Sequence, residues 1–300
     1  MDRIGQIGDF TFRLCCPEEI APPENFRKFL KKEETGGGLS AAGSRAAAPD
    51  FTYRIKISDA LPRPEGKVLA RRSDLAVFQT KSGESRLIGV KGRERPYAYY
   101  EETGEDCAEI TLVREELRGL HIDPVFTSLF VLERRMICRD SLILHCAYMV
   151  YRGRAILFSA PSETGKSTQA GLWERYRGSR TVNGDRALLR KIGGVWNACG
   201  WPVCGTSEIC HVEDAPVFAV VMLRQGKVNL AERLSPVQAF TQLCAQVTIN
   251  PWNRDFVSRA MNGIEDLIGS VPVWQLTCDI SEAAVVCLET ALFPQDLNYS

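Results

Sequence analysis

The stretch LILHCAYMVYRGRAILFSAPSETGKST, residues 142–168, decides how the chain is interpreted. Two apolar runs, 142–151 and 154–160, flank Gly153, a pattern typical of two strands joined by a tight turn. They lead into APSETGKS, residues 160–167, which is a small residue, four others and then Gly-Lys-Ser, as in a phosphate loop. A helix is expected from about Lys166 to Tyr176. The sequence therefore predicts the strand, loop and helix that a phosphate loop requires.

This loop has the chemistry to hold a polyphosphate. Backbone amides can curl round a phosphate at the positive end of the following helix. Gly165 removes the Cβ that would block close approach, Lys166 can neutralise charge between the β- and γ-phosphates, and the Ser167 hydroxyl can ligate Mg²⁺. The usual first Gly is replaced by Ala160, which is tolerable at a negative φ. The predicted cofactor-binding residues are Ala160, Pro161, Ser162, Glu163, Thr164, Gly165, Lys166, Ser167 and Thr168.

Two more side chains are candidates for chemistry. Asp185, in TVNGDRALLR, follows a predicted strand, where a carboxylate can hold Mg²⁺ or accept a proton from an acceptor hydroxyl. An Asp in a Gly-Asp turn is also an ordinary turn residue. His145 is expected either as a core group or within reach of the γ-phosphate or Asp185. The predicted catalytic residues are Asp185, His145 and Lys166, and the predicted metal ligands are Ser167 and Asp185.

Residues 142–168, together with VNGDRALL, resemble the C-terminal catalytic domain of HPr kinase/phosphorylase. That family's pattern is a His-containing strand, a Gly turn, an apolar strand, the phosphate loop and an Asp-Asp pair. WPVCGTSEIC, RLSPVQAF and INPWNRDF are loosely similar to short HPr-kinase-like proteins associated with modified-peptide biosynthesis, a branch that also resembles phosphoenolpyruvate carboxykinases. The resemblance implies an α/β fold with a P-loop mixed-sheet core. It also implies ATP- and Mg²⁺-dependent transfer of the γ-phosphoryl group to a serine of a peptide or protein.

The sequence departs from that family at two places. Gly184-Asp185 stands where the family has Asp-Asp, so one carboxylate works alone or Asn183 substitutes in metal binding. The family's downstream metal glutamate has no secure counterpart, with only Glu208, Glu213 and Asp214 nearby. These departures leave a second function open, an ATP-binding regulatory or scaffold protein with little or no transferase activity. Carboxykinase-like chemistry would need a second metal site that the sequence does not locate.

The pattern changes along the chain predict two domains. Residues 1–130 indicate a smaller strand-rich domain, containing a flexible Gly-, Ala- and Ser-rich loop at 35–50 and a mostly antiparallel sheet from Phe51 onward. Residues 124–139 have the spacing of an amphipathic helix at its end. Residues 131–300 form the kinase-like domain, in which Ser235-Pro236 predicts a helix start. Basic residues dominate 51–100 and acidic residues 101–150, so the first domain is a candidate to grip the partner.

Composition excludes several other classes of protein. The formal net charge is zero, which argues against a nucleic-acid binder. No apolar run reaches the roughly 18 residues that span a bilayer, and the opening residues lack a secretory signal pattern. The 11 cysteines are therefore expected to be reduced, in a cytoplasmic protein without a membrane partner, and an oligomer stays open. A zinc site at Cys199, Cys204, Cys210 and His211 is disfavoured by their spacing.

Overall fold

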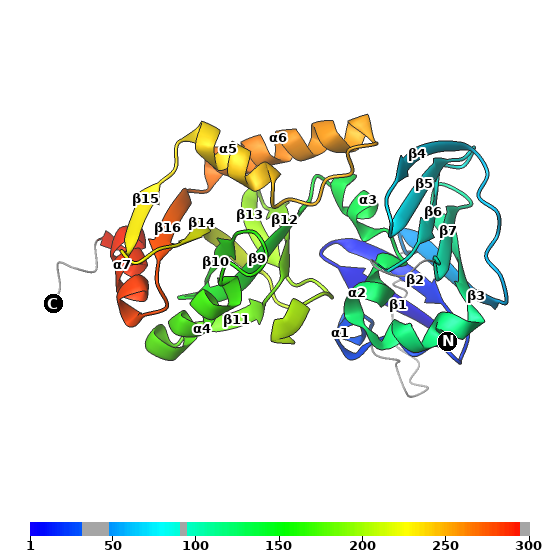
Figure 1. Cartoon of the computed structure of the whole chain (residues 1–300), viewed down its shortest axis with the longest axis horizontal. Coiled ribbons are helices and arrows are strands. Elements are labelled where there is room, and N and C mark those ends of the chain that lie inside the picture. The colour runs from blue at the N-terminus through cyan, green and yellow to red at the C-terminus, as the bar shows by residue number, and fades with distance from the viewer. Residues whose placement is uncertain (32–47, 91–94, 295–300) are drawn as a thin grey trace, which may run out of the picture. The chain divides into compact units, whose positions relative to one another are not determined.

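A computed structural model describes residues 1–31, 48–90 and 95–294 of the chain. The chain divides into two compact units, Met1–Leu132 and Glu133–Ser300 (Figure 1). Each unit has its own mixed β-sheet, and helices accompany both sheets, so the fold is mixed α/β. Most of the predicted flexible loop 35–50 lies outside the described residues.

The first unit is built on an eight-stranded sheet with the order β1-β2-β3-β8-β7-β6-β5-β4. The pairs β2–β3 and β3–β8 are parallel, and the other neighbours are antiparallel. The prediction of a sheet starting at Phe51 missed its first two strands. The alternation of apolar and polar residues along a strand shows which of its faces is buried. It does not show whether the neighbouring strand is parallel or antiparallel. The strands are β1 (Asp2–Ile7), β2 (Phe10–Cys15), β3 (Phe51–Ser58), β4 (Lys67–Arg71), β5 (Leu75–Gln79), β6 (Glu84–Ile88), β7 (Ala98–Glu102) and β8 (Cys107–Val113).

Aromatic rings form much of the core of this unit. The Phe130 ring lies 4.9 Å from that of Phe26 and 5.0 Å from that of Tyr53, centroid to centroid. The helix predicted over 124–139 is interrupted, since α2 ends at Ser128 and Val131, with a φ of 50°, cannot continue a right-handed helix. That prediction of one helix was wrong. The helices of the first unit are α1 (Glu24–Arg27) and α2 (Asp123–Ser128), with a 3₁₀ helix at Arg114–His121, and α3 (Leu132–Ile137) begins at the boundary and belongs mostly to the second unit.

The second unit contains a mixed sheet along the path β10-β9-β12-β13-β14-β16-β15, with β11 beside β9. Strand β10 also pairs in parallel with β14, so five strands close into a ring. The first half of β9 pairs with β12 and the second half with β10 and β11. The strands are β9 (Leu142–Tyr151), β10 (Arg154–Ser159), β11 (Arg180–Asn183), β12 (Arg186–Ile192), β13 (Val195–Cys199), β14 (Ala215–Gln225), β15 (Leu230–Arg233) and β16 (Val273–Cys278).

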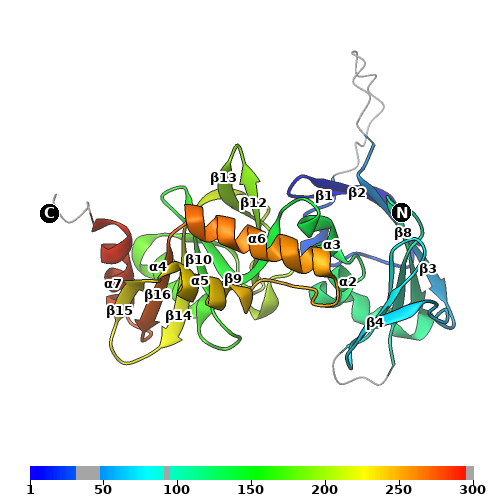
Figure 2. The same cartoon turned by 90° about the horizontal axis from the view of Figure 1, so that it is seen from above.

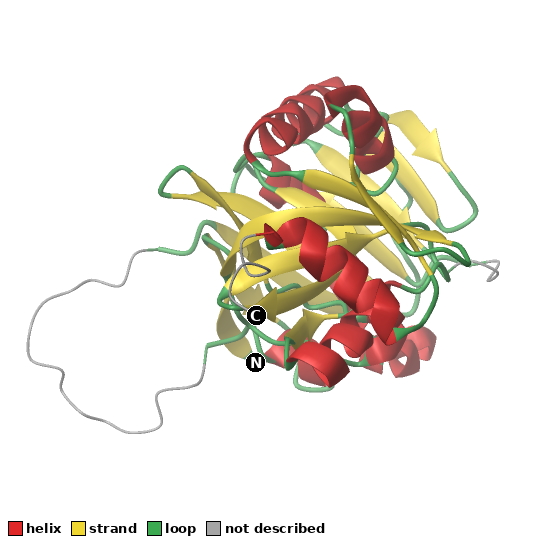
Figure 3. Cartoon of the chain, turned by 90° about the vertical axis from the view of Figure 1, so that its left-hand side faces the viewer, coloured by secondary structure: helices red, strands yellow, loops and turns green. Residues whose placement is uncertain are grey.

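Helices cover both faces of this sheet (Figures 1 and 3). Helices α5 (Pro236–Cys244) and α6 (Arg254–Ser270) lie on one side, and α6 crosses the strands in Figure 2. Helices α4 (Lys166–Arg177) and α7 (Glu282–Leu292) lie on the other. Strand β9 is apolar along most of its length because both of its faces are buried. Leu144 and Cys146 join the core under α6, and Ala147 and Met149 join the core under α4.

No helix among the described residues is long and apolar enough to cross a membrane.

Candidate functional site

The predicted phosphate loop connects β10 to α4. Two residues turn its backbone into the left-handed region, Glu163 with a φ of 65° and Gly165 with a φ of 106°. A Cβ at Gly165 would meet no atom of the described residues within 4 Å, so its positive φ, rather than crowding, is what favours glycine there. Ala160 is buried and does not have a positive φ, as its substitution for Gly requires. Helix α4 then starts at Lys166, and its first backbone N–H groups face the loop.

Lys166 is folded back onto this loop. Its Nζ donates to the carbonyl oxygens of Ala160 at 3.1 Å and Pro161 at 3.2 Å, and only 7% of the residue is exposed. Burial lowers the pKa of Lys166, and the nearby Asp185 carboxylate only partly opposes this effect. A partly desolvated ammonium gains most from a nearby anion. The loop therefore offers a buried cation and a helix N-terminus at one place.

The loop and the Gly184-Asp185 turn lie next to each other. The Ser167 hydroxyl donates to the Gly184 carbonyl oxygen at 3.2 Å, and the Thr164 hydroxyl donates to Pro161 O at 2.9 Å inside the loop. Ser162 and Thr168 are exposed. The Lys166 ammonium and the Ser167 hydroxyl of the loop and the Asp185 carboxylate of the turn thus lie on two neighbouring segments of the second unit.

The structure brings His145 and Asp185 together. His145 Nε2 lies 3.5 Å from Asp185 Oδ1, and Arg186 Nε donates to Oδ2 at 3.1 Å. Burial alone raises the pKa of Asp185, but the contact with His145 and the charges of Arg186 and Lys166 outweigh it, so the pKa lies below its ordinary value. Of the two sequence-based alternatives for His145, the contact with Asp185 is the one observed. The imidazole is at the edge of the site and not in the apolar core.

Asn183 has a different role from the one expected. Its side chain is fully buried, its Nδ2 donates to Trp201 O at 2.8 Å and Val203 O at 3.1 Å, and its Oδ1 accepts from the backbone N–H groups of Asp185 and Arg186. The suggestion that Asn183 substitutes for the missing carboxylate in metal binding is wrong, because its amide is already used inside the protein. Asn183 instead fixes the turn that presents Asp185.

Gly184 is glycine for a steric reason. A Cβ at this position would lie 1.9 Å from Ser207 Oγ and 2.4 Å from Ser207 Cβ. Ser207 belongs to the 3₁₀ turn Gly205–Ser207, where a Cβ on Gly205, whose φ is 61°, would come within 3.1 Å of Asp185 Cβ. The 204–208 loop therefore packs directly over the turn. Any second carboxylate at 184 would displace it.

The remaining metal and cysteine candidates of the described residues do not gather into a metal site. Glu208 is exposed with a φ of 56°, and Glu213 pairs with Arg180. The Cys210 thiol lies 3.3 Å from Trp201 O. Within residues 1–31, 48–90 and 95–294, no group of three or more His, Cys, Asp or Glu side chains is placed to hold a metal ion. All 11 cysteines lie within these same ranges, and each is a thiol outside any disulfide.

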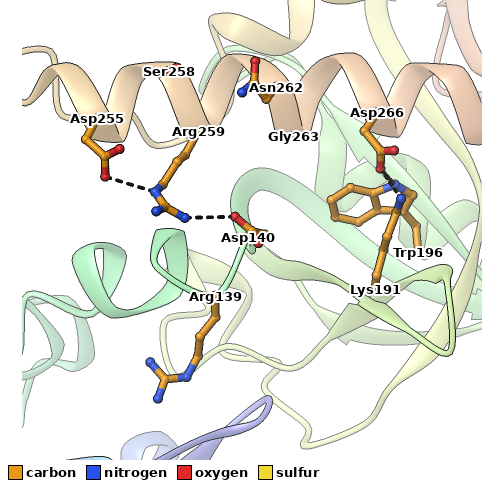
Figure 4. A pocket seen from close by; sticks show the side chains of 10 residues that line it. All are labelled: Arg139, Asp140, Lys191, Trp196, Asp255, Ser258, Arg259, Asn262, Gly263 and Asp266. Atoms are coloured by element: carbon orange, nitrogen blue, oxygen red, sulfur yellow. Dashed lines mark hydrogen bonds and ion pairs between the residues drawn. The ribbon is translucent and has the colours of Figure 1, made fainter.

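A cavity of about 660 Å³ lies in the second unit away from the loop, between α6 and the β12–β13 hairpin (Figure 4). Its charged groups pair across its own walls. Arg259 contacts Asp255 at 3.0 Å and Asp140 at 3.2 Å, while Asp266 accepts from Lys191 at 2.6 Å and from Trp196 Nε1 at 2.9 Å. None of the predicted site residues is among those that line this cavity. We therefore place the candidate site at the phosphate loop, whose buried cation and helix N-terminus suit an anion.

Sequence reasoning missed two residues that support the site. Gln246 Oε1 lies 3.3 Å from His145 Nδ1, and Thr248 Oγ1 accepts from Arg186 Nη1 at 3.3 Å. They lie 101 and 62 residues from their partners along the chain. No local pattern marks them, because an extended segment after a helix has no distinctive composition.

Comparison with known proteins adds little to this geometry. No family model matches the sequence, and no curated protein matches it. Among solved structures, the chain is similar to the HPr(Ser) kinase/phosphatase from Coxiella burnetii, with 13% identity, a TM-score of 0.31, and coverage of 52% of this chain and 91% of that chain.

Proposed function

We propose that the chain is an ATP- and Mg²⁺-dependent kinase that transfers the γ-phosphoryl group to a hydroxyl, with a serine of a peptide or protein as the acceptor. The observation that carries this proposal is the pairing of two features. Lys166 lies on a glycine-turned loop at the start of α4, and Asp185 lies on the adjacent turn, linked to the loop through Ser167 and Gly184.

The phosphate end of the nucleotide belongs at the loop. Lys166 and the first N–H groups of α4 would hold its phosphate oxygens, with the remaining loop residues 160–168 around them. The donor types also fit a magnesium-nucleotide complex, because the Ser167 hydroxyl and the Asp185 carboxylate are hard oxygen ligands. Bound Mg²⁺ supplies charge neutralisation at the phosphates.

Asp185 and His145 belong at the acceptor. Since its pKa is low, Asp185 is ionised at neutral pH and can take the proton from an acceptor hydroxyl. His145 and Arg186 hold its two oxygens and so restrict the direction from which a hydroxyl can approach. Most of the catalysis then comes from positioning and charge neutralisation, as in phosphoryl transfer generally.

A second function is favoured by one observation. The position of the family's second carboxylate is Gly184, and Ser207 fills the space beside it. A protein that binds ATP at the loop but transfers phosphate slowly or not at all would also have this arrangement. In that case the bound nucleotide serves a regulatory or scaffolding role.

The test uses the purified full-length chain with Mg²⁺, γ-labelled ATP and a library of serine-containing peptides. Calorimetry measures ATP binding, and mass spectrometry measures phosphate gained by the peptides. Binding with phosphate gain on serine supports the kinase, and binding without gain supports the regulatory function. Absence of Mg²⁺-dependent ATP binding contradicts both. Lys166→Ala is the matched control for loop-dependent binding.

A further inference from the structure

Three residues after α5 run along the start of β9. The His145 backbone N–H donates to Gln246 O at 3.0 Å, and the Thr248 N–H donates to Ile143 O at 2.9 Å. Leu144 and Val247 form the antiparallel bridge between these bonds. Residues 246–248 therefore form a short extended segment, fixed to the strand that carries His145 by its own backbone.

The alternate side chains of this segment reach the two residues that hold Asp185. Successive side chains of an extended segment point to opposite sides, so Gln246 and Thr248 share a side. Gln246 contacts His145 Nδ1, and Thr248 accepts from Arg186 Nη1, both at 3.3 Å. His145 and Arg186 in turn hold Oδ1 and Oδ2 of Asp185. Each carboxylate oxygen is thus supported by one member of the segment.

We propose that residues 246–248 position the catalytic carboxylate, with Gln246 orienting His145 and Thr248 orienting Arg186. The catalytic part of this proposal rests on the proposed function, whereas the orientation of His145 does not. Gln246 and Thr248 act on Asp185 through His145 and Arg186, so both are positioning residues. Functional side chains are commonly oriented by a partner side chain that is itself fixed by a further hydrogen bond.

The contacts on the two sides of His145 fix the orientation of its ring. Asp185 Oδ1 can only accept, so the nitrogen of His145 that holds it, Nε2, carries a proton. Nδ1 then faces the side-chain amide of Gln246, which can bond to it through its oxygen or its NH₂ group. Gln246 is only 9% exposed, so little water competes for this bond. The prediction is that Gln246 keeps His145 in the orientation in which a protonated Nε2 faces Asp185 in the protein without nucleotide.

The experiment is ¹⁵N–¹H NMR of the full chain labelled at histidine. The chain has three histidines, and the His145 signals are assigned by their loss in His145→Gln. We expect Nε2 to be protonated in the native chain, its signal to shift in Gln246→Leu as the ring loses its partner at Nδ1, and Gln246→Glu, which offers acceptor oxygens only, to draw a proton to Nδ1. Gln242→Leu is the control, because Gln242 bonds to Gln275 of β16.

An unchanged His145 spectrum in Gln246→Leu would overturn the proposal, as would a proton on Nδ1 alone in the native chain. If the kinase proposal holds, Gln246→Leu and Thr248→Val should each lower kcat for peptide phosphorylation by about 10- to 100-fold, the range typical of lost orienting partners, with KM for ATP unchanged. Equal loss in Gln242→Leu would contradict it. If the native chain fails to bind Mg²⁺-ATP, the kinase proposal fails and the NMR result still decides the orientation of His145.

Discussion

The phosphate loop and the Asn183–Arg186 turn lie side by side but are held together in opposite ways. Lys166 bonds to residues five and six positions earlier, and Thr164 to one three positions earlier. The turn instead depends on Trp201, Val203 and Ser207 and on the distant His145. The loop, for which we propose phosphate binding, is therefore held by contacts between residues close in the sequence. The turn, for which we propose the orientation of Asp185, is held by residues distant in the sequence. Substitutions in the two should fail differently.

The largest expected effect is a loss of phosphate transfer without a loss of folding. Asp185→Asn keeps the shape of the turn, because Asn183 holds it through the backbone. It removes the proton acceptor, so phosphate transfer should fall by about 10²- to 10⁴-fold, the usual range for general-base catalysis. Transfer to a serine peptide and the circular dichroism spectrum are the measurements. Native activity in the Asp185→Asn variant would remove Asp185 from the mechanism.

Lys166→Ala should act through binding and charge. Loss of one charged donor to the transferring phosphate should lower transfer by about 10²- to 10³-fold and weaken ATP binding, as for other lost transition-state donors. The loop should keep its course because Thr164 and Gly165 set it locally. Calorimetric titration with Mg²⁺-ATP checks the binding. Undiminished affinity would show that the loop does not hold the nucleotide through this residue.

A steric substitution probes the turn without touching its chemistry. Gly184→Ala should destabilise the second unit by about 1–3 kcal/mol, since its Cβ would lie 1.9 Å from Ser207 Oγ. Ser207→Gly removes that side chain, so the double variant should recover most of the loss. Denaturant unfolding of the four proteins in this cycle gives the coupling. Additive losses would mean that the two positions do not collide. Gly171→Ala is the matched control, because a Cβ at this position of α4 would meet no described residue beyond its own helix within 4 Å.

The smallest effect is on the pH dependence of stability. The pKa of Asp185 is lowered from its ordinary 3.8 in the folded chain, so its ionised form stabilises the fold above that pH. This contribution is lost as the pH falls through the lower, folded pKa. The free energy of unfolding should therefore decline more steeply below about pH 4 in the native chain than in Asp185→Asn. Parallel declines would indicate that His145 and Arg186 do not stabilise the carboxylate.

The same contrast explains what the sequence could predict. Strands 142–151 and 154–159, helix 166–177 and the helix start at Ser235-Pro236 follow from neighbouring residues, and the structure contains them. The break at Val131 and the parallel partners of β3 depend on packing between distant segments. So do the buried role of Asn183 and the contacts of Gln246. Hydrophobic periodicity predicts which face of a helix or strand is buried, and it does not predict which neighbouring element covers that face.

The clash between position 184 and Ser207 also limits how this protein can change. A second acidic residue beside Asp185 costs stability when it is acquired in one step, because a Cβ at 184 meets the hydroxymethyl group of Ser207. If Ser207 is replaced by glycine first, a side chain at 184 gains space. A lineage, or an engineer, that seeks two adjacent acidic residues therefore loses less stability when the serine is removed first.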